Sequence, residues 1–393
     1  MTTVSPGTAA DVSDVLTRAF HDNHLVSIAG AGTKSGWGSM VQSPDVVLST
    51  SKLTRVVAHR HGDLTATVEA GAALDDVNRE LAHHGQWLPL DPPWSDRATI
   101  GGIVATNDSG PRRHRYGAPR DLIIGIDIVR ADGVAAKSGG IVVKNVAGYD
   151  IGRLMTGSFG TLGVIVSATF KLYPLPATSR TVVIDLLNGA ASDARIATLL
   201  SALVHSQLTP TAIEVQTPPL RLLVRFETIE VAADQQAAAA TALAEGAGAG
   251  VAVLRNDEES ALWIEHGRRP WSGEGAVFKV TMLPADVAPT VAWLSGLSRD
   301  IDHDIVGRAA VGVLLVRVGG SDESQARLLA ALRERIRTGR GSAVVVRGSD
   351  SFRTMIDPWG PLGDGVALMQ SIKKQFDPKG ILNPGRGPVS QKP

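Results

Sequence analysis

Glycine and hydroxyl residues gather in three short segments of this chain, and their spacing suits the binding of an anion. The first, SIAGAGTKSGWG at 27–38, has four glycines in nine positions and carries Thr33, Lys34 and Ser35 among them. Consecutive backbone N–H groups that no Cβ obstructs form a concave anion site, and nearby hydroxyls add donors. The alternative for a single segment is a tight turn in which glycine supplies a positive φ.

Two further segments of the same kind favour a ligand over an isolated turn. PPWSDRATIGGIVATNDSG at 92–110 and GYDIGRLMTGSFGTLGVIV at 148–166 also combine glycines with hydroxyl side chains. Together, the three segments predict one long ligand that backbone groups hold at several points. A diphosphate with aromatic rings at either end is such a ligand.

The first segment does not match two widespread phosphate-binding motifs. A P-loop needs glycine directly before Lys-Ser/Thr, whereas Thr33 precedes Lys34 here. The dinucleotide fingerprint GxGxxG needs a third glycine where this chain has Ser35, and the residues that follow do not predict a helix. The backbone chemistry is therefore similar, but the motif is different.

The composition excludes several other classes of function. The 393-residue chain has 39 basic and 39 acidic residues, with no block of like charge that would suit nucleic acid or an anionic membrane. It contains no cysteine, which excludes disulfides, cysteine-bound zinc, a conventional iron–sulfur cluster and a cysteine-linked cofactor. We expect no secretory signal and no integral membrane segment, because the N-terminus lacks the signal pattern and the apolar runs are short.

Histidines are the candidate proton acceptors of the second half, and no residue is assigned as catalytic. His205 lies in a predicted helix, and His303 is isolated in DIDHDIVG. His266 in WIEHGRRP joins a base to the cations Arg268 and Arg269 in a predicted loop. An exposed basic turn is the favoured alternative for that loop.

Two other clusters of basic residues have competing interpretations. His59 and His61 have a spacing that can hold a metal, but no carboxylate is nearby, so we expect an exposed loop and no metal site. RRHRYG at 112–117 directly follows the second glycine segment. A clamp that faces a cofactor or substrate and a surface turn are equally consistent with it.

The elements that must position these residues follow from periodicity. In the first half, strands are predicted at 24–29, 45–51, 54–60, 63–72, 121–133 and 164–176, with helices at 11–23 and 74–85. In the second half, strands are predicted at 180–187, 212–216, 221–227, 251–254, 276–283, 309–318 and 341–348, with helices at 192–208, 231–248, 288–299, 324–337 and 365–376. The pattern predicts an α+β domain followed by a second sheet with helices on one face.

The quoted segments resemble a known family. GAGTKSGWG, ATIGGIVATNDSGPRRHRYGAPRDLIIGIDIV and VVKNVAGYDIGRLMTGSFGTLGVIVSATFKLYP resemble the FAD-binding domain of the vanillyl-alcohol oxidase / p-cresol methylhydroxylase (PCMH) superfamily. KNVAGYDIGRLMTGSFGTLGV and FDPKGILNPGR look most similar to the FAD-linked glycolate oxidase group, especially the smaller of its two FAD-binding subunits. The resemblance covers about residues 20–176, is thinner over 177–360 and returns at 361–386.

This resemblance implies a fold and a set of cofactor contacts. It implies a two-subdomain FAD-binding domain at 1–176, a second α/β domain of antiparallel strands covered by helices at 177–360, and a C-terminal helix and arm at 361–393 that packs back near the first domain. The contacts implied for FAD are Gly30, Ala31, Gly32, Thr33, Lys34, Ser35 and Gly36 at the pyrophosphate, Thr99, Gly101, Gly102, Thr106, Asn107 and Ser109 at the diphosphate and flavin, and Gly160, Gly163 and Ile165 around the adenosine and the ring. Asp121 and Tyr149 are expected to be scaffold.

The resemblance also implies an activity. We expect an FAD-binding subunit of a glycolate oxidase-like 2-hydroxyacid dehydrogenase, in the cytoplasm or peripheral to the inner membrane face through partners. A second flavin subunit and an iron–sulfur subunit would be those partners. FAD is expected to bind non-covalently, because Thr33 stands where covalent relatives often carry histidine, and the chain has no cysteine. The alternatives are a stand-alone FAD oxidase of another alcohol and a non-catalytic assembly subunit, since the histidine-rich metal cluster of larger relatives is absent.

Overall fold

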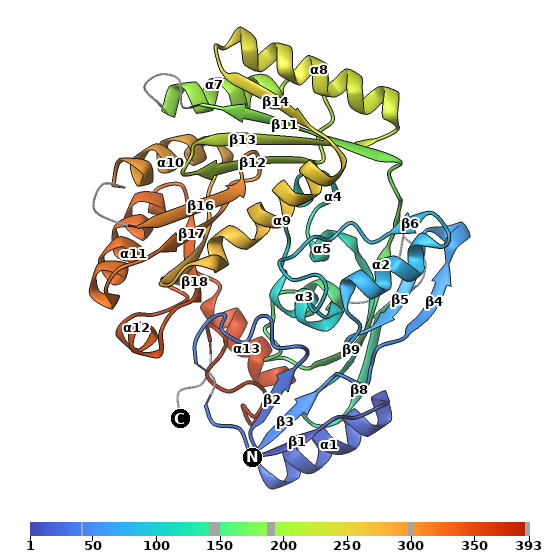
Figure 1. Cartoon of the computed structure of the whole chain (residues 1–393). Coiled ribbons are helices and arrows are strands. Elements are labelled where there is room, and N and C mark those ends of the chain that lie inside the picture. The colour runs from blue at the N-terminus through green and yellow to red at the C-terminus, as the bar shows by residue number, and fades with distance from the viewer. Residues whose placement is uncertain (41, 141–149, 187–192, 298–301, 390–393) are drawn as a thin grey trace. The chain divides into compact units, whose positions relative to one another are not determined.

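The structure is a computed structural model, and it describes residues 1–40, 42–140, 150–186, 193–297 and 302–389 (Figure 1). The chain divides into two compact units. Unit 1 comprises Met1–Ser109, Gly117–Leu175 and Pro361–Pro393, and unit 2 comprises Gly110–Tyr116 and Pro176–Gly360. Both ends of the chain therefore belong to unit 1. None of the helices in the described ranges is long and apolar enough to cross a bilayer.

Unit 1 contains a parallel three-stranded sheet, an antiparallel five-stranded sheet and a two-stranded ladder. Their strand orders are β1-β3-β2, β4-β5-β9-β7-β8 and β10-β6. The strands are β1 (Thr2–Val4), β2 (Val26–Ala29), β3 (Val46–Ser49), β4 (Val56–Arg60), β5 (Thr65–Glu69), β6 (Gln86–Trp87), β7 (Ile123–Val129), β8 (Ala135–Gly139), β9 (Val164–Lys171) and β10 (Tyr173–Pro174). The expected α+β fold with two subdomains is confirmed.

Short helices connect these strands. They are α1 (Ala9–Asp22), α2 (Leu74–Ala82), α3 (Ile100–Thr106), α5 (Pro119–Leu122), α6 (Ile151–Met155) and α13 (Val366–Phe376), with a 3-10 turn η1 (His61–Asp63). Helix α1 begins at a capping box in which Thr8 Oγ1 accepts from Asp11 N at 3.1 Å and the Asp11 carboxylate accepts from Thr8 N at 3.0 Å. It buries Val12 and Leu16 in the core that includes Leu48.

A tight turn joins β7 to β8 at the Asp-Gly pair 132–133. Gly133 has a φ of 82°, and a Cβ there would lie 2.0 Å from Thr17 Oγ1. Only glycine fits this position, because the left-handed backbone and the contact with α1 both exclude a side chain.

Unit 2 is built on an eight-stranded antiparallel sheet in the order β14-β11-β13-β12-β16-β17-β15-β18. Its strands are β11 (Thr178–Asp185), β12 (Ala212–Thr217), β13 (Arg221–Thr228), β14 (Gly250–Leu254), β15 (Ala276–Thr281), β16 (His303–Arg308), β17 (Val313–Val318) and β18 (Ser342–Arg347). Its helices are α4 (Arg113–Tyr116), α7 (Asp193–Val204), α8 (Glu230–Gly246), α9 (Asn256–Ser272), α10 (Val287–Gly296), α11 (Asp322–Arg337) and α12 (Asp350–Met355), with a 3-10 turn η2 (Pro284–Asp286).

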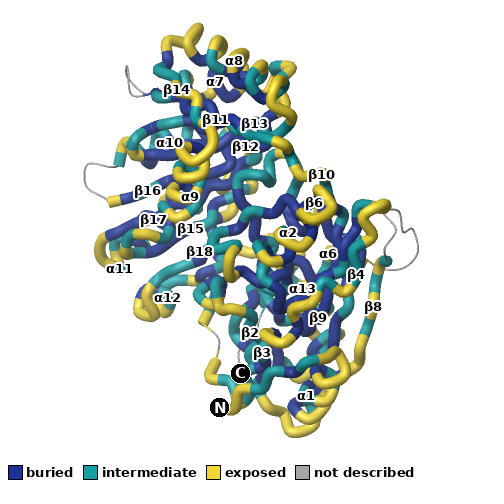
Figure 2. The backbone as a smooth tube through the Cα atoms, turned by 45° about the vertical axis from the view of Figure 1, so that its right-hand side comes forward, coloured by how far each residue is buried: buried dark blue, intermediate teal, exposed yellow. Residues whose placement is uncertain are grey.

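The two faces of this sheet differ in chemistry, as β12 shows. Ile213 and Val215 belong to the apolar core that residues of α7, α8, α10 and α11 share. Figure 2 shows the central strands as buried and the outer side of α8 as exposed. Because side chains alternate along a strand, Glu214 and Gln216 project to the other face, where α9 covers them.

Two predictions for unit 2 are wrong. WIEHGRRP lies in helix α9 and not in a loop, so helices cover both faces of the sheet and not one. Strand β16, which begins at His303, was not predicted. The face that α9 buries is polar, with Glu259 and His266 in contact with the sheet, so the apolar periodicity that predicts a helix is missing. Pro270 near its end also disfavoured a helix.

Candidate functional site

The first and second glycine segments are in contact within unit 1. A Cβ on Gly30 would lie 2.3 Å from Thr99 Oγ1, and a Cβ on Gly101 would lie 2.8 Å from the Cβ of Ala70. Thr99 is the N-cap of α3, and its hydroxyl accepts a long hydrogen bond of 3.4 Å from Gly102 N. The close approach of the two segments therefore depends on glycine.

A buried ion pair joins the same two segments. Lys34 Nζ lies 3.1 Å from Asp108 Oδ2, and each side chain is only 6% exposed. The ammonium also lies 3.3 Å from Thr33 Oγ1 and 5.9 Å from the centre of the Trp37 ring. Asp108 was not among the predicted site residues, because a single acidic residue beside Asn107 carries no motif signal.

The third segment attaches to the second through the backbone. Gly157 N donates to Val104 O at 3.0 Å and Phe159 N donates to Ala105 O at 2.8 Å, both on α3. Phe159 and Gly160 have φ values of 56° and 69°, which form the turn before β9. The three glycine segments therefore meet in one region of unit 1.

The C-terminal arm, residues 377–387, joins the first and third segments. Asn383 is 2% exposed. Its Oδ1 accepts from Ile28 N in β2 at 2.9 Å, and its Nδ2 donates to Phe159 O at 2.8 Å. Sequence reasoning missed this residue, although it recognised the surrounding motif.

The arm is itself held by a buried ion pair. Asp377 is fully buried and accepts from Lys373 Nζ at 2.6 Å and from the backbone N–H groups of Ile381 and Leu382 at 3.0 and 2.9 Å. Lys373 Nζ also donates to Thr161 O at 2.7 Å, which ties α13 to the third segment. The arm thus has a fixed path beside the glycine segments.

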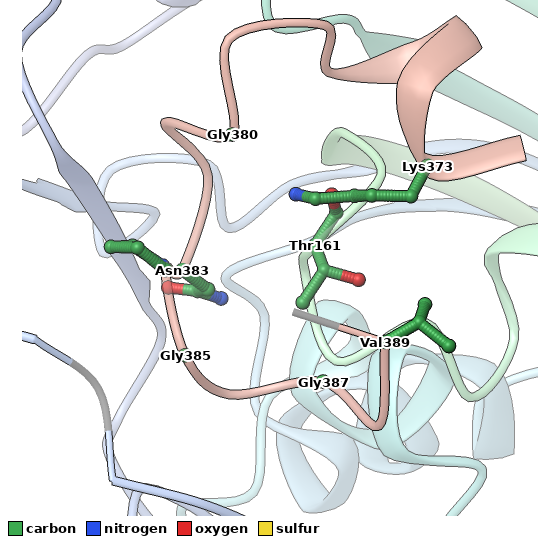
Figure 3. Close-up of a pocket in the computed structure, with 8 residues that line it drawn as sticks. Thr161, Lys373, Gly380, Asn383, Gly385, Gly387 and Val389 are labelled. Carbon is green, nitrogen blue, oxygen red and sulfur yellow. The ribbon is translucent and has the colours of Figure 1, made fainter. Parts of the chain in front are cut away.

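A small pocket lies where the arm meets the third segment (Figure 3). It is lined by Thr161, Lys373, Gly380, Asn383, Pro384, Gly385, Gly387 and Val389. Within the same stretch of the arm, Arg386 donates to the backbone carbonyls of Lys34 and Ser35 in the first segment. The arm therefore reaches all the way from the third segment to the first.

The residues present fit a dinucleotide. Gly32 has a φ of 74°, and a Cβ there would meet nothing within 4 Å, so the first segment presents open backbone. Asn107 Oδ1 and Ser158 Oγ are buried, and neither has a hydrogen-bond partner among the described residues. Buried polar atoms are normally satisfied, and a dinucleotide would offer the missing partners, with donors on its polar ring edges for Asn107 Oδ1 and phosphate oxygens for the Ser158 hydroxyl.

All the predicted cofactor contacts lie in unit 1, and their surroundings differ. Ala31, Gly32 and Ser35 are exposed. Thr106 Oγ1 donates to Gly102 O at 2.7 Å, and Ile165 pairs with Ile128 in the β7–β9 ladder. The contact of each predicted residue with a cofactor stays a prediction.

Of the two residues that were expected to be scaffold, the structure describes only one. Asp121 Oδ2 accepts from Ala118 N at 2.8 Å and caps α5. Tyr149 lies outside the described residues.

His266 is not placed as a solvent-facing base. It is 2% exposed, and its Nε2 and Nδ1 lie 3.0 Å from Glu214 Oε2 and 3.0 Å from Gln216 Oε1. Arg269 pairs with Asp304 at 2.6 Å. Both interpretations of WIEHGRRP, a base–cation loop and an exposed basic turn, are therefore wrong for these two residues, which attach α9 to the sheet.

The other candidate histidines are also in structural surroundings. His303 is buried in β16, and the exposed His205 has its Nδ1 2.9 Å from Ser201 O. The rings of His61 and His84 stack with centroids 4.5 Å apart, and His59 Nε2 lies 2.9 Å from Gln86 Oε1. Within the described ranges, no group of three or more side chains could hold a metal ion.

Residues 110–116 attach to the sheet of unit 2. Arg112 contacts Glu227 at two points, with Nη2–Oε1 and Nε–Oε2 distances of 2.8 and 3.1 Å. Burial raises the pKa of Glu227, but the charges of Arg112 and Arg225 outweigh it, and the pKa is lowered. Burial lowers the pKa of His114. A surface turn is therefore wrong for Arg112, and a clamp that faces a ligand stays a prediction.

Family comparisons agree with this geometry. Residues 2–139 match the FAD binding domain model, and residues 361–386 match the C-terminal domain of FAD linked oxidases. The second match coincides with the arm that carries Asn383 and Arg386.

Two curated relatives align along most of the chain, and a third aligns with part of it. Glycolate oxidase subunit GlcD of Bacillus subtilis (strain 168) is 27% identical over 416 aligned positions, which cover 98% of this chain and 88% of that protein. D-2-hydroxyglutarate dehydrogenase of Xanthomonas citri pv. viticola is 28% identical, with 97% and 88% covered. Glycolate oxidase subunit GlcE of Escherichia coli (strain K12) is 36% identical over 163 residues, 41% of this chain and 46% of that protein.

Solved structures share the fold at low identity. Glucooligosaccharide oxidase of Acremonium strictum superposes with a TM-score of 0.71 at 13% identity and covers 99% of this chain and 91% of that one. Alkyldihydroxyacetonephosphate synthase gives a TM-score of 0.71 at 16% identity, with 97% and 76% covered.

Proposed function

We propose that this chain, which is a PCMH-type FAD-binding flavoprotein, is the FAD-binding subunit of a glycolate oxidase-like 2-hydroxyacid dehydrogenase. It is an FAD-dependent oxidoreductase of the kind that acts on CH–OH donors. The observation that carries the proposal is the meeting of three glycine segments and the C-terminal arm within unit 1. Relatives named for 2-hydroxy acids along nearly the whole chain support the substrate class.

The residues proposed to hold FAD divide by segment. The backbone of residues 30–36 would bind the diphosphate, residues 99–109 would line the diphosphate and the flavin, and Gly160, Gly163 and Ile165 would surround the adenosine and the ring. Asn107 and Ser158 would give their unpartnered polar atoms to the ligand. When bound, FAD supplies the acceptor for the hydride that leaves the hydroxyl-bearing carbon of the substrate.

FAD is held without a covalent bond in this proposal. The three glycine segments contain neither histidine nor cysteine, the side chains that form such links in related flavoproteins. The chain has no cysteine at all and cannot ligate a conventional iron–sulfur cluster. Onward electron transfer therefore needs a partner, and we propose a second flavin subunit and an iron–sulfur subunit. These partners would place the chain in the cytoplasm or at the inner membrane face.

A non-catalytic assembly role is the second candidate, and one observation favours it. The strongest sequence candidate for a base, His266, is buried against Glu214 and Gln216 in unit 2. Among the described residues, no histidine lines the pocket between the arm and the third segment. We propose that unit 2 serves either as a substrate domain or as an interaction domain. The first role belongs to the catalytic function and the second to the assembly function.

Native co-purification followed by anaerobic reduction tests the proposal. A tagged chain expressed in its own cells is expected to retain yellow flavin and a cysteine-rich companion. Addition of a 2-hydroxy acid is expected to bleach the flavin in that complex. Bleaching by other alcohols but not by 2-hydroxy acids would instead identify a stand-alone oxidase. A complex that keeps its flavin but never bleaches would favour the assembly role.

A further inference from the structure

We infer that Lys34 and Asp108 form a buried ion pair whose opposite charges cancel. The pair fixes the first two glycine segments in the geometry that binds FAD. In this assignment Lys34 is a positioning residue and does not give its charge to the diphosphate. The inference rests on the proposed function, because it assigns a role within the proposed FAD site.

The direction of the Lys34 side chain carries the argument. Ala31, Gly32 and Ser35 form the exposed part of the first segment, whereas Lys34 is 7% exposed. Its ammonium lies between Asp108 Oδ2 at 3.1 Å and Thr33 Oγ1 at 3.3 Å. A lysine that serves an incoming phosphate would present its ammonium on the exposed side of the loop. Here the exposed side offers backbone instead.

The position of Asp108 in the sequence shows which groups the ion pair holds in place. Asp108 directly follows Asn107, which ends α3 with a φ of 48° and whose buried Oδ1 lacks a partner among the described residues. Lys34 is also fixed through its backbone carbonyl, which accepts from Arg386 at 3.2 Å. The pair therefore sets the first segment and the Asn107 amide relative to each other.

The energetics of buried pairs provide a discriminating test. Removal of one charge leaves the other buried and uncompensated, which is strongly destabilising, whereas replacement of both by apolar residues is often neutral. If Lys34 instead contacted a phosphate of FAD directly, the variants would show the opposite pattern of FAD affinities. Loss of Asp108 would then free the lysine for the ligand, and loss of Lys34 could not be rescued by a second change.

The experiment compares four variants of the full chain, Lys34→Met, Asp108→Asn, Lys34→Met/Asp108→Leu and the control Lys52→Met, which removes an exposed lysine of unit 1. FAD affinity is measured by quenching of flavin fluorescence. The two single variants are each expected to bind FAD at least about tenfold more weakly, and the double variant and the control within about threefold of wild type. Equal losses in Lys34→Met and the double variant, with Asp108→Asn as tight as wild type or tighter, would overturn the inference.

Urea unfolding of the FAD-free chain provides a readout that does not need the cofactor. The two single variants are expected to unfold at a midpoint lower by about 1 M, with recovery in the double variant. Unchanged midpoints in both single variants would show that the pair does not position the segments. A wild-type chain that binds no FAD overturns the proposed function, and the urea series still decides whether the pair supports these segments.

Discussion

Asn383 and Ile28 are 355 positions apart in the sequence, yet the side-chain amide of Asn383 accepts a hydrogen bond from the backbone N–H of Ile28 at 2.9 Å. The same amide donates to Phe159 O at 2.8 Å. One buried side chain thus connects the strand that leads into the first glycine segment with the turn of the third. The proposed FAD site needs the C-terminal arm for its shape, even where the arm contributes no ligand contact.

Replacement of Asn383 tests this connection. Asn383→Ala takes this hydrogen-bond partner from the half-buried N–H of Ile28 and the half-buried carbonyl of Phe159, which costs up to about 1–3 kcal/mol for each group. We expect FAD affinity to fall by at least about tenfold and thermal stability to fall with it. Gln370→Ala removes an exposed amide from α13 in the same C-terminal segment and is the matched control. Wild-type FAD affinity in Asn383→Ala would contradict the role of the arm.

The contact between Gly30 and Thr99 predicts that Gly30→Ala impairs FAD binding and that a second substitution at Thr99 partly restores it. Gly30→Ala places a Cβ 2.3 Å from Thr99 Oγ1, so the two segments must separate. We expect FAD binding to be lost in a chain that still folds. Adding Thr99→Ala removes the clashing oxygen and should restore part of the affinity, although the cap of α3 is lost at about 1 kcal/mol.

The matched control for this pair is Gly62→Ala, because a Cβ at Gly62 meets nothing within 4 Å. It is expected to leave FAD affinity and melting temperature unchanged. If Gly30→Ala binds FAD as well as Gly62→Ala does, the close approach of the two segments is not required for the site.

The Glu227 carboxylate predicts acid sensitivity in unit 2. Burial raises its pKa, but Arg112 and Arg225 outweigh burial and hold the pKa below its ordinary value of 4.5. A lowered folded pKa contributes stability that is present above the unfolded pKa and is lost as pH falls through the folded one. We therefore expect melting temperatures to fall below about pH 4.5.

Two glutamine substitutions isolate that contribution in melts from pH 7 to pH 3. Glu227→Gln should lower stability at neutral pH and should show a smaller further loss in acid. Glu258→Gln removes an exposed carboxylate on α9 and should keep the wild-type pH profile. An identical acid transition in Glu227→Gln and wild type would mean that another group controls it.

Substitution of His266 separates a structural role from a catalytic one. His266→Leu deprives the buried Glu214 and Gln216 side chains of this hydrogen-bond partner, so unit 2 should melt at a lower temperature, by an amount that corresponds to about 1–3 kcal/mol for each group. FAD affinity should not change, because the proposed cofactor site lies in unit 1. His205→Leu, which changes an exposed residue directly after the end of α7, is the control. A folded His266→Leu chain that lost only its flavin reduction by substrate would assign His266 to the chemistry.

The glycine segments were predictable because the absence of a Cβ is visible in the sequence itself. At Gly30 the structure uses that absence for close contact between the first and second segments, and at Gly101 for close contact with Ala70 at the end of β5. Asp108 and Asn383 were not predictable in the same way. Each acts through a partner far away in the sequence, and a pairing over such a distance leaves no local period or motif.

The second half shows a different failure of sequence reasoning. Strands β12 and β13 and the Ala-rich helix α8 were predicted from their apolar patterns. Helix α9 was missed because it is buried through Glu259 and His266, whose hydrogen bonds and ion pairs replace the apolar stripe. The same error assigned His266 to a solvent-facing loop.

Release of the cofactor from the purified chain tests the central claim, that the three glycine segments and the C-terminal arm form one non-covalent FAD site. The native chain is saturated with FAD, freed of excess and precipitated with acid, and the flavin in the supernatant is quantified against protein. We predict a single FAD for each chain, released in full, and its loss in Gly30→Ala. A colourless chain that takes up no FAD, or flavin that stays with the precipitate, would contradict the account.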